Sequence, residues 1–147
     1  MVFTKHPYRC QGFSLLEVLI TFIVLSVGLL GLAALDANGL KNNQSAYWRS
    51  QATILGYSII DSMRANRTAA LNGDYNLILT AAPPSGSTIV AKDLLGWIQA
   101  LSTTLPEGDG AINCNTATAV CQVVVQWDDR MGEGGSSAQS FSVTTQL

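Results

Sequence analysis

The sequence predicts an α+β fold in which a long N-terminal helix is packed by a small antiparallel β-sheet head with one short extra helix. One observation is that residues 18–35 contain no charged side chain, which is typical of a membrane-spanning helix. A second is that the C-terminal third contains polar segments with alternating hydrophobicity, as in half-buried strands. With 147 residues, the chain is long enough for one such head.

The first half of the helix is the apolar stretch from Phe13 to Leu35. As a helix it measures about 34 Å, which is enough to cross a bilayer core of about 30 Å. Lys5 and Arg9 precede it, so the positive-inside rule predicts a cytoplasmic N-terminus. Everything after Leu35 then lies on the other side of the membrane, in the periplasm.

Helical spacing continues past the membrane, and no proline occurs between Phe13 and Ala82. Asn72 and Gly73 supply a helix stop, so a continuous helix would run from Phe13 to Leu71. Three glycines are its weak points, where it either packs closely against another helix or unwinds: Gly28, Gly31 and Gly39.

The remaining chain, residues 72–147, forms the head together with residues 36–71. It begins with a loop over residues 72–90 and continues with a short helix over residues 91–104, for which Asp93 is a candidate N-cap. Three strands follow: 111–114, 120–127 and 140–147. Trp48 and Trp97 are expected to pack in the core, because no basic residues cluster around them for nucleic-acid stacking.

Glu17 is unusual because it lies near the start of a membrane helix. A carboxylate there costs about 2–3 kcal/mol or more unless it has a partner, so such residues indicate function. An alternative is a secretory signal cleaved after the small residues of Gly31-Leu32-Ala33. Glu17 interrupts the early apolar core that such a signal needs, which makes this alternative less favoured.

The basic leader, the segment Gly12-Phe13-Ser14-Leu15-Leu16-Glu17 and the long uncharged helix resemble the class III signal of type IV pilins and type II secretion pseudopilins. This resemblance implies that a prepilin peptidase removes residues 1–12 by cutting between Gly12 and Phe13. The same enzyme would methylate the new amino group of Phe13.

The spacing of Phe13 and Glu17 has a physical logic of its own. Cleavage creates a cationic amine at Phe13, one helical turn before Glu17. In a bundle of such helices both charges must be neutralised, and an axial stagger of one subunit would bring one chain's amine to its neighbour's Glu17. That pair would fix the register of the bundle. A salt bridge within one chain is the alternative.

Further segments are similar to the PilV family of type IV pilus minor pilins. They are Ser26–Ala33, Arg64-Ala65-Asn66, the helix around Trp97, Val123–Asp129 and Gln139–Leu147. This resemblance implies a subunit that joins other minor pilins and the major pilin through the N-terminal helix, primes pilus assembly near the tip with an adhesin, and supports twitching motility and adhesion. It would reside in the inner membrane before entering the fibre.

The sequence is also compatible with two other functions. One is a minor pseudopilin of a type II secretion system. Major pilins usually carry a proline in the helix, and its absence here favours a minor pilin or a pseudopilin. The other is a single-pass anchor for a periplasmic ligand-binding domain, which would never assemble and would need no proteolysis.

The cysteines fit export and processing. Cys10 leaves with the leader, so Cys114 and Cys121 remain as a pair on the oxidising side of the membrane, where we expect a disulfide. The only histidine, His6, leaves too. The mature chain then lacks Ser-His and Cys-His systems, and we expect no enzyme, no cofactor and no zinc site.

An acidic group occurs near a glycine-rich turn: Asp128, Asp129 and Glu133. It could bind calcium, but a solvated turn in which an aspartate bonds its own backbone is the favoured interpretation. The formal charge of −2 suggests no electrostatic footprint for nucleic acid, so no nucleic-acid partner is expected.

Overall fold

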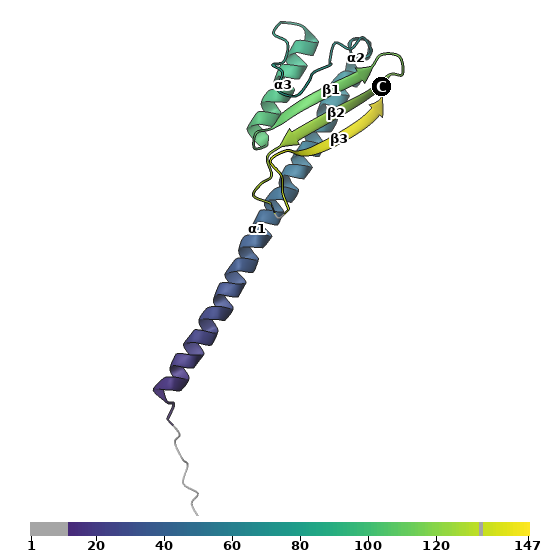
Figure 1. The fold of residues 1–147 in the computed structure, drawn as a ribbon. Coiled ribbons are helices and arrows are strands. Elements are labelled where there is room, and N and C mark those ends of the chain that lie inside the picture. Colours follow the sequence, from purple (N-terminus) through teal and green to yellow (C-terminus); the bar gives the residue numbers. More distant parts are fainter. Residues whose placement is uncertain (1–11, 133) are drawn as a thin grey trace, which may run out of the picture. The chain divides into compact units, whose positions relative to one another are not determined.

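The computed structural model describes residues 12–132 and 134–147 and has the predicted α+β layout (Figure 1). The chain divides into two compact units, one ending at Asn38 and one running from Gly39 to Leu147. The long helix α1 (Leu15–Ala65) contributes residues to both units. The second unit contains the sheet and the remaining helices, and is called the head below.

Helix α1 does not continue to Leu71, as a single helix would. Asn66 adopts φ −118° and ψ 50°, and a separate short helix α2 (Arg67–Leu71) follows it. Asparagine favours such interruptions because its short polar side chain competes for backbone hydrogen bonds in non-helical conformations. The predicted stop is confirmed, since Gly73 follows α2 with φ +84°, a conformation that favours glycine.

Helix α3 (Ile89–Thr104) begins two residues before the predicted start, and its N-cap is Thr88 instead of Asp93. The Thr88 hydroxyl accepts a hydrogen bond from the Ala91 N–H at 3.2 Å, which satisfies one of the open donors of the first turn. Asp93 lies in the second turn and accepts a hydrogen bond from the Tyr75 hydroxyl at 2.6 Å.

The sheet has the order β1-β2-β3 and is antiparallel throughout. Its strands are β1 (Asp109–Asn115), β2 (Val120–Trp127) and β3 (Gln139–Gln146). The first strand is longer at both ends than predicted, because pairing with β2 extends from Asp109 to Asn115. The predicted alternation is confirmed: Val123, Val125 and Trp127 are buried, and β3 alternates half-buried with exposed residues.

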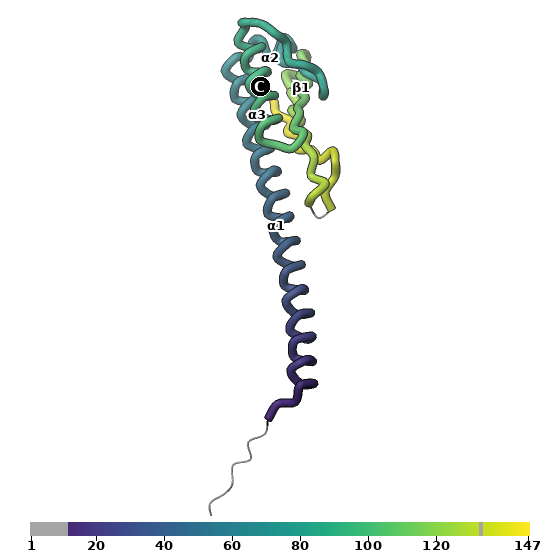
Figure 2. Tube along the Cα trace, turned by 90° about the vertical axis from the view of Figure 1, so that its left-hand side faces the viewer, coloured from purple at the N-terminus to yellow at the C-terminus, as the bar shows by residue number. Residues whose placement is uncertain are grey.

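In the head, α1 from Gly39 onward, α3 and the sheet lie side by side (Figures 1 and 2). The buried core residues come from all three. Gly56 lets the sheet approach α1, since a Cβ there would lie 3.1 Å from the Phe141 ring. The Trp97 indole N–H of α3 donates to the Leu55 carbonyl at 3.0 Å. Trp97 is buried and Trp48 packs against the core, which confirms their predicted packing roles.

Candidate functional site: the N-terminal junction and the apolar helix

The predicted cleavage junction lies directly before α1. Gly12 and Phe13 are exposed, and the Phe13 side chain is 81% accessible. A Cβ on Gly12 would meet no described atom within 4 Å. The leader charges Lys5 and Arg9, together with His6 and Cys10, lie outside the described residues.

Ser14 begins the helix as its N-cap. Its hydroxyl accepts a hydrogen bond from the Glu17 N–H at 3.2 Å, and its carbonyl accepts from the Glu17 and Val18 N–H groups. Sequence analysis missed this cap, although the Ser-x-x-Glu spacing is the signature of a capping box. The cap explains why α1 starts at Leu15 and not at Phe13.

Glu17 occupies the first turn of α1, where a negative charge is favoured by the helix dipole. Its side chain is exposed, and among the described residues its carboxylate has no hydrogen bond and no salt bridge. The carboxylate is therefore free to form a salt bridge with a cation on another chain. Phe13, where cleavage would create such a cation, lies four positions earlier in sequence.

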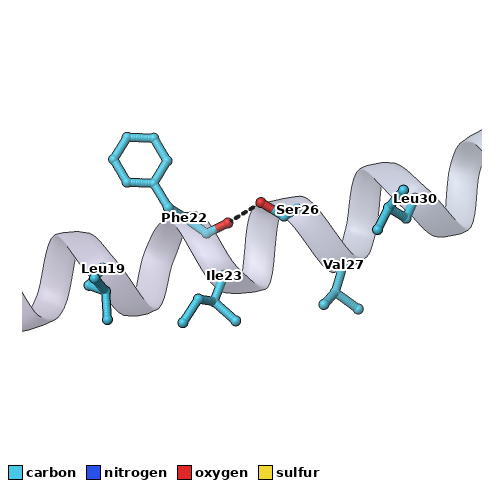
Figure 3. A pocket seen from close by; sticks show the side chains of 6 residues that line it. All are labelled: Leu19, Phe22, Ile23, Ser26, Val27 and Leu30. Carbon is cyan, nitrogen blue, oxygen red and sulfur yellow. Dashed lines mark hydrogen bonds between the residues drawn. The ribbon is translucent and has the colours of Figure 1, made fainter.

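The apolar segment that follows is long and hydrophobic enough to cross a membrane, by length and composition, and none of it is buried. Figure 3 shows one face, a shallow groove on the helix lined by Leu19, Phe22, Ile23, Ser26, Val27 and Leu30. The Ser26 hydroxyl donates to the Phe22 carbonyl at 2.6 Å, and the Thr21 hydroxyl bonds the Glu17 and Val18 carbonyls. These side chains thus need no water, which suits a lipid environment.

Three of the four glycines of α1 have no packing partner among the described residues. A Cβ at Gly28, Gly31 or Gly39 would meet nothing within 4 Å, and α1 is helical through all three positions. No contact among the described residues therefore explains why these three positions are glycine.

The acidic turn of the head is built differently from the solvated turn that we predicted. Asp129 is 1% exposed, and its Oδ2 accepts a hydrogen bond from the Ser45 hydroxyl of α1 at 2.5 Å. The Asp129 N–H donates to the Ser136 carbonyl of the same loop at 2.8 Å. The bond from Ser45 therefore anchors this loop on α1. Its Oδ1 has no partner among the described groups.

Asp128 follows the favoured interpretation more closely, because its Oδ1 accepts from the Arg130 N–H at 2.9 Å. The Arg130 guanidinium also binds this carboxylate, and that hydrogen bond holds the Asp128 pKa below its usual value. Glu133 lies outside the described residues. Within the described ranges no group of three or more acidic, cysteine or histidine side chains converges on one point.

Cys114 and Cys121 form a disulfide in the structure, as expected. They face each other directly across β1 and β2, and both are buried. The bond therefore closes the β1–β2 hairpin inside the head.

Residues 7–33 match the family described as "Prokaryotic N-terminal methylation motif". No curated protein and no solved structure is significantly similar to the chain. The matched segment contains the Gly12–Phe13 junction, the Ser14 cap, Glu17 and most of the apolar span. The motif indicates processing by a prepilin peptidase, anchoring in a membrane and assembly with other pilins, and hence a type IV pilin or pseudopilin.

Proposed function

We propose that this protein is a minor pilin that assembles with other minor pilins to prime type IV pili. The observation that carries the proposal is Glu17, an exposed carboxylate without a described partner at the start of an unburied apolar helix. Such an apolar segment is stable when lipid or other helices cover it. Inside an apolar bundle, such a carboxylate is stable when it forms an ion pair with a cation.

The cation comes from Phe13 once the leader is removed. Cleavage after Gly12 creates an amine at the helix start, and methylation keeps its charge. In a staggered bundle, the amine of one subunit reaches Glu17 of its neighbour. The pair then selects one axial register among many that apolar side chains alone would allow.

The similarity to the PilV family over the later segments supports a minor pilin over a major one, as does the lack of a proline between Phe13 and Ala82. The role is assembly without catalysis. Pilus biogenesis, twitching motility and adhesion would depend on it, with other minor pilins, the major pilin and a tip adhesin as partners.

Replacement of Glu17 tests the pairing. Glu17→Ala should still be processed to a Phe13 N-terminus but be nearly absent from sheared fibres, because its helix cannot neutralise a neighbour's amine. Asp36→Ala, which removes the next carboxylate along α1, is the matched control and should be incorporated normally. Normal amounts of Glu17→Ala in fibres would refute the proposal.

A deletion strain separates the pilus from a type II secretion system. We expect loss of twitching and of surface pili, with export of folded enzymes intact. Intact twitching with lost export would instead assign the chain to a pseudopilus.

A further inference from the structure

The two edges of the head's sheet differ. At the outer edge of β1, the residues whose backbone points away from β2 are Gly110, Ile112 and Cys114, as the alternation of an antiparallel ladder requires. Ile112 exchanges both backbone hydrogen bonds with Leu77, at 2.8 and 2.9 Å. The Cys114 N–H donates to the Asn76 side chain at 2.7 Å, and the Gly110 N–H to the Asp109 side chain at 2.7 Å. This edge is closed.

The outer edge of β3 is open. The Leu147 N–H donates to the Ala119 carbonyl, which shows that the odd-numbered residues of β3 direct their backbone N–H and C=O groups toward β2. In an antiparallel ladder the even-numbered residues then direct these groups away from β2. These residues are Ser140, Ser142, Thr144 and Gln146. In the part of the chain that the structure describes, none of their N–H groups has a hydrogen-bond partner. Their side chains are exposed as well.

The strand also lacks the features that usually protect an edge. Its eight residues include no charge, no proline and no glycine, and it pairs with β2 without a bulge. Proteins normally protect such edges with lysine, proline, bulges or a covering segment, because an open edge recruits other strands. The chain protects β1 in this way and leaves β3 open, which is what a strand-addition site requires.

Positive charge flanks the open edge. Arg49 lines a groove with Gln139, Ser140 and Phe141 at the start of β3. Arg64 donates to the Thr145 hydroxyl at 3.3 Å, and Arg67 donates to the Leu147 carbonyl at 2.7 Å. These are three of the six basic residues after the leader. Among the described Asp and Glu side chains, Asp61 is the one paired with them, at 3.2 Å from Arg64.

We propose that the open edge of β3 binds an extended acidic segment of a different protein by β-strand addition. Backbone hydrogen bonds to Ser140, Ser142, Thr144 and Gln146 would hold the added strand, and the three arginines would select acidic side chains on it. The proposal does not depend on N-terminal processing.

A second copy of this chain fits the edge poorly. With β1 closed, two copies would pair β3 with β3 in antiparallel fashion, about a two-fold axis perpendicular to the sheet. That axis would also reverse the α1 segments that lie on the two sheets, from Gly39 onward. Subunits anchored in one membrane share a direction, so the partner strand must come from another protein.

The test uses the full chain in neutral detergent micelles and a fluorescein-labelled peptide of four alternating valine–glutamate pairs. Binding is measured by fluorescence anisotropy, and amide exchange is followed by NMR. The peptide should bind and slow exchange at Ser140, Ser142, Thr144 and Gln146. A matched valine–lysine peptide should bind at least about tenfold more weakly because the arginines repel it.

Two kinds of variant locate the site. Ser142→Pro removes one outward N–H without touching the β2–β3 ladder and should weaken binding about fivefold to tenfold, whereas Ser142→Ala should not. Replacing the three arginines by glutamine should also weaken binding, and Lys92→Gln on α3 should not. If the β2 amides of Ser142→Pro exchange fast, the substitution has disrupted the sheet. Binding by the variant with the three arginines replaced then tests the proposal instead.

Several results would overturn the proposal. Equal binding of both peptides, or binding that leaves the four β3 amides unprotected, would contradict it. Protection of these amides that rises with protein concentration without peptide would show that a second copy of the chain covers the edge instead.

Discussion

Two carboxylates of this chain, Glu17 and Asp129, have opposite environments. Glu17 is exposed at the start of α1 without a described partner, whereas Asp129 is 1% exposed and bonded to Ser45. The first is available to another chain. The second fastens the loop between β2 and β3 to α1, and so belongs to the stability of the head.

Removing the buried carboxylate should weaken the head. Asp129→Ala loses the charge-assisted bond to Ser45 and releases the loop from α1, so we expect the free energy of unfolding to fall by about 1–3 kcal/mol. Urea unfolding of the full chain in micelles measures this. Asp74→Ala, at an exposed position, is the control and should change it by less than about 0.5 kcal/mol. Equal effects would contradict the anchoring role.

Tyr75 makes the head sensitive to alkaline pH. Burial, together with its hydrogen bond to Asp93, raises the pKa of Tyr75 from 10.0 to about 12. As the pH rises, the Tyr75 hydroxyl therefore deprotonates at lower pH in the unfolded chain than in the folded chain. The stabilisation present below pH 10 is lost as the pH rises toward 12. The loss should be about 2–3 kcal/mol.

Urea unfolding midpoints of the full chain, measured between pH 8 and 12, test this predicted loss of stability. Tyr75→Phe should remove most of the decline above pH 10, because phenylalanine does not titrate. The same decline in Tyr75→Phe would show that other groups cause it.

At the residue scale, the sequence allows predictions where the signal is local, and the processing and pairing roles of the N-terminal residues stay predictions. The spacing of Gly12, Phe13 and Glu17 needs no tertiary contact to be recognised. The burial of Asp129 was missed because its partner, Ser45, is 84 positions away, and no local pattern predicts that contact. The Ser14 cap could have been read from its spacing to Glu17.

Among the elements, types and order were predictable and boundaries less so. Helix and strand periodicity placed the long helix, α3 and the three strands. The start of α3 was wrong because Thr88 competes with Asp93 as a cap and lies where the chain turns. Strand β1 was longer than predicted because its length is set by pairing with β2, and the bridge from Leu77 to Ile112 has no local signal.

The contact between α3 and β1 requires a glycine. A Cβ at Gly110 would lie 2.3 Å from the Trp97 ring and 2.8 Å from Leu101. Gly110→Ala should therefore lower the free energy of unfolding by about 1–3 kcal/mol through overpacking.

Gly96 on α3 supplies the control for this prediction. A Cβ there would meet nothing within 4 Å, so Gly96→Ala should stabilise the helix by about 0.5–1 kcal/mol. Both variants are compared by denaturant unfolding. A neutral Gly110→Ala would mean that α3 can move away from the sheet.

The whole molecule combines two units with different sources of stability. The head has its own core and a disulfide, which should contribute about 2 kcal/mol by closing a short loop. The apolar segment before Asn38 has no buried residue in the described chain and depends on lipid or on neighbouring helices. Such a division suits a subunit that moves from a membrane into a fibre.

Entry of this protein into a fibre depends on the chemistry at Gly12–Phe13. Mass spectrometry of the N-terminus of the protein isolated from membranes and from fibres measures the product of that chemistry. We predict a chain that begins at an N-methylated Phe13, and no such species from Gly12→Val. A chain that keeps residues 1–12, or one that begins after Ala33, would contradict the account.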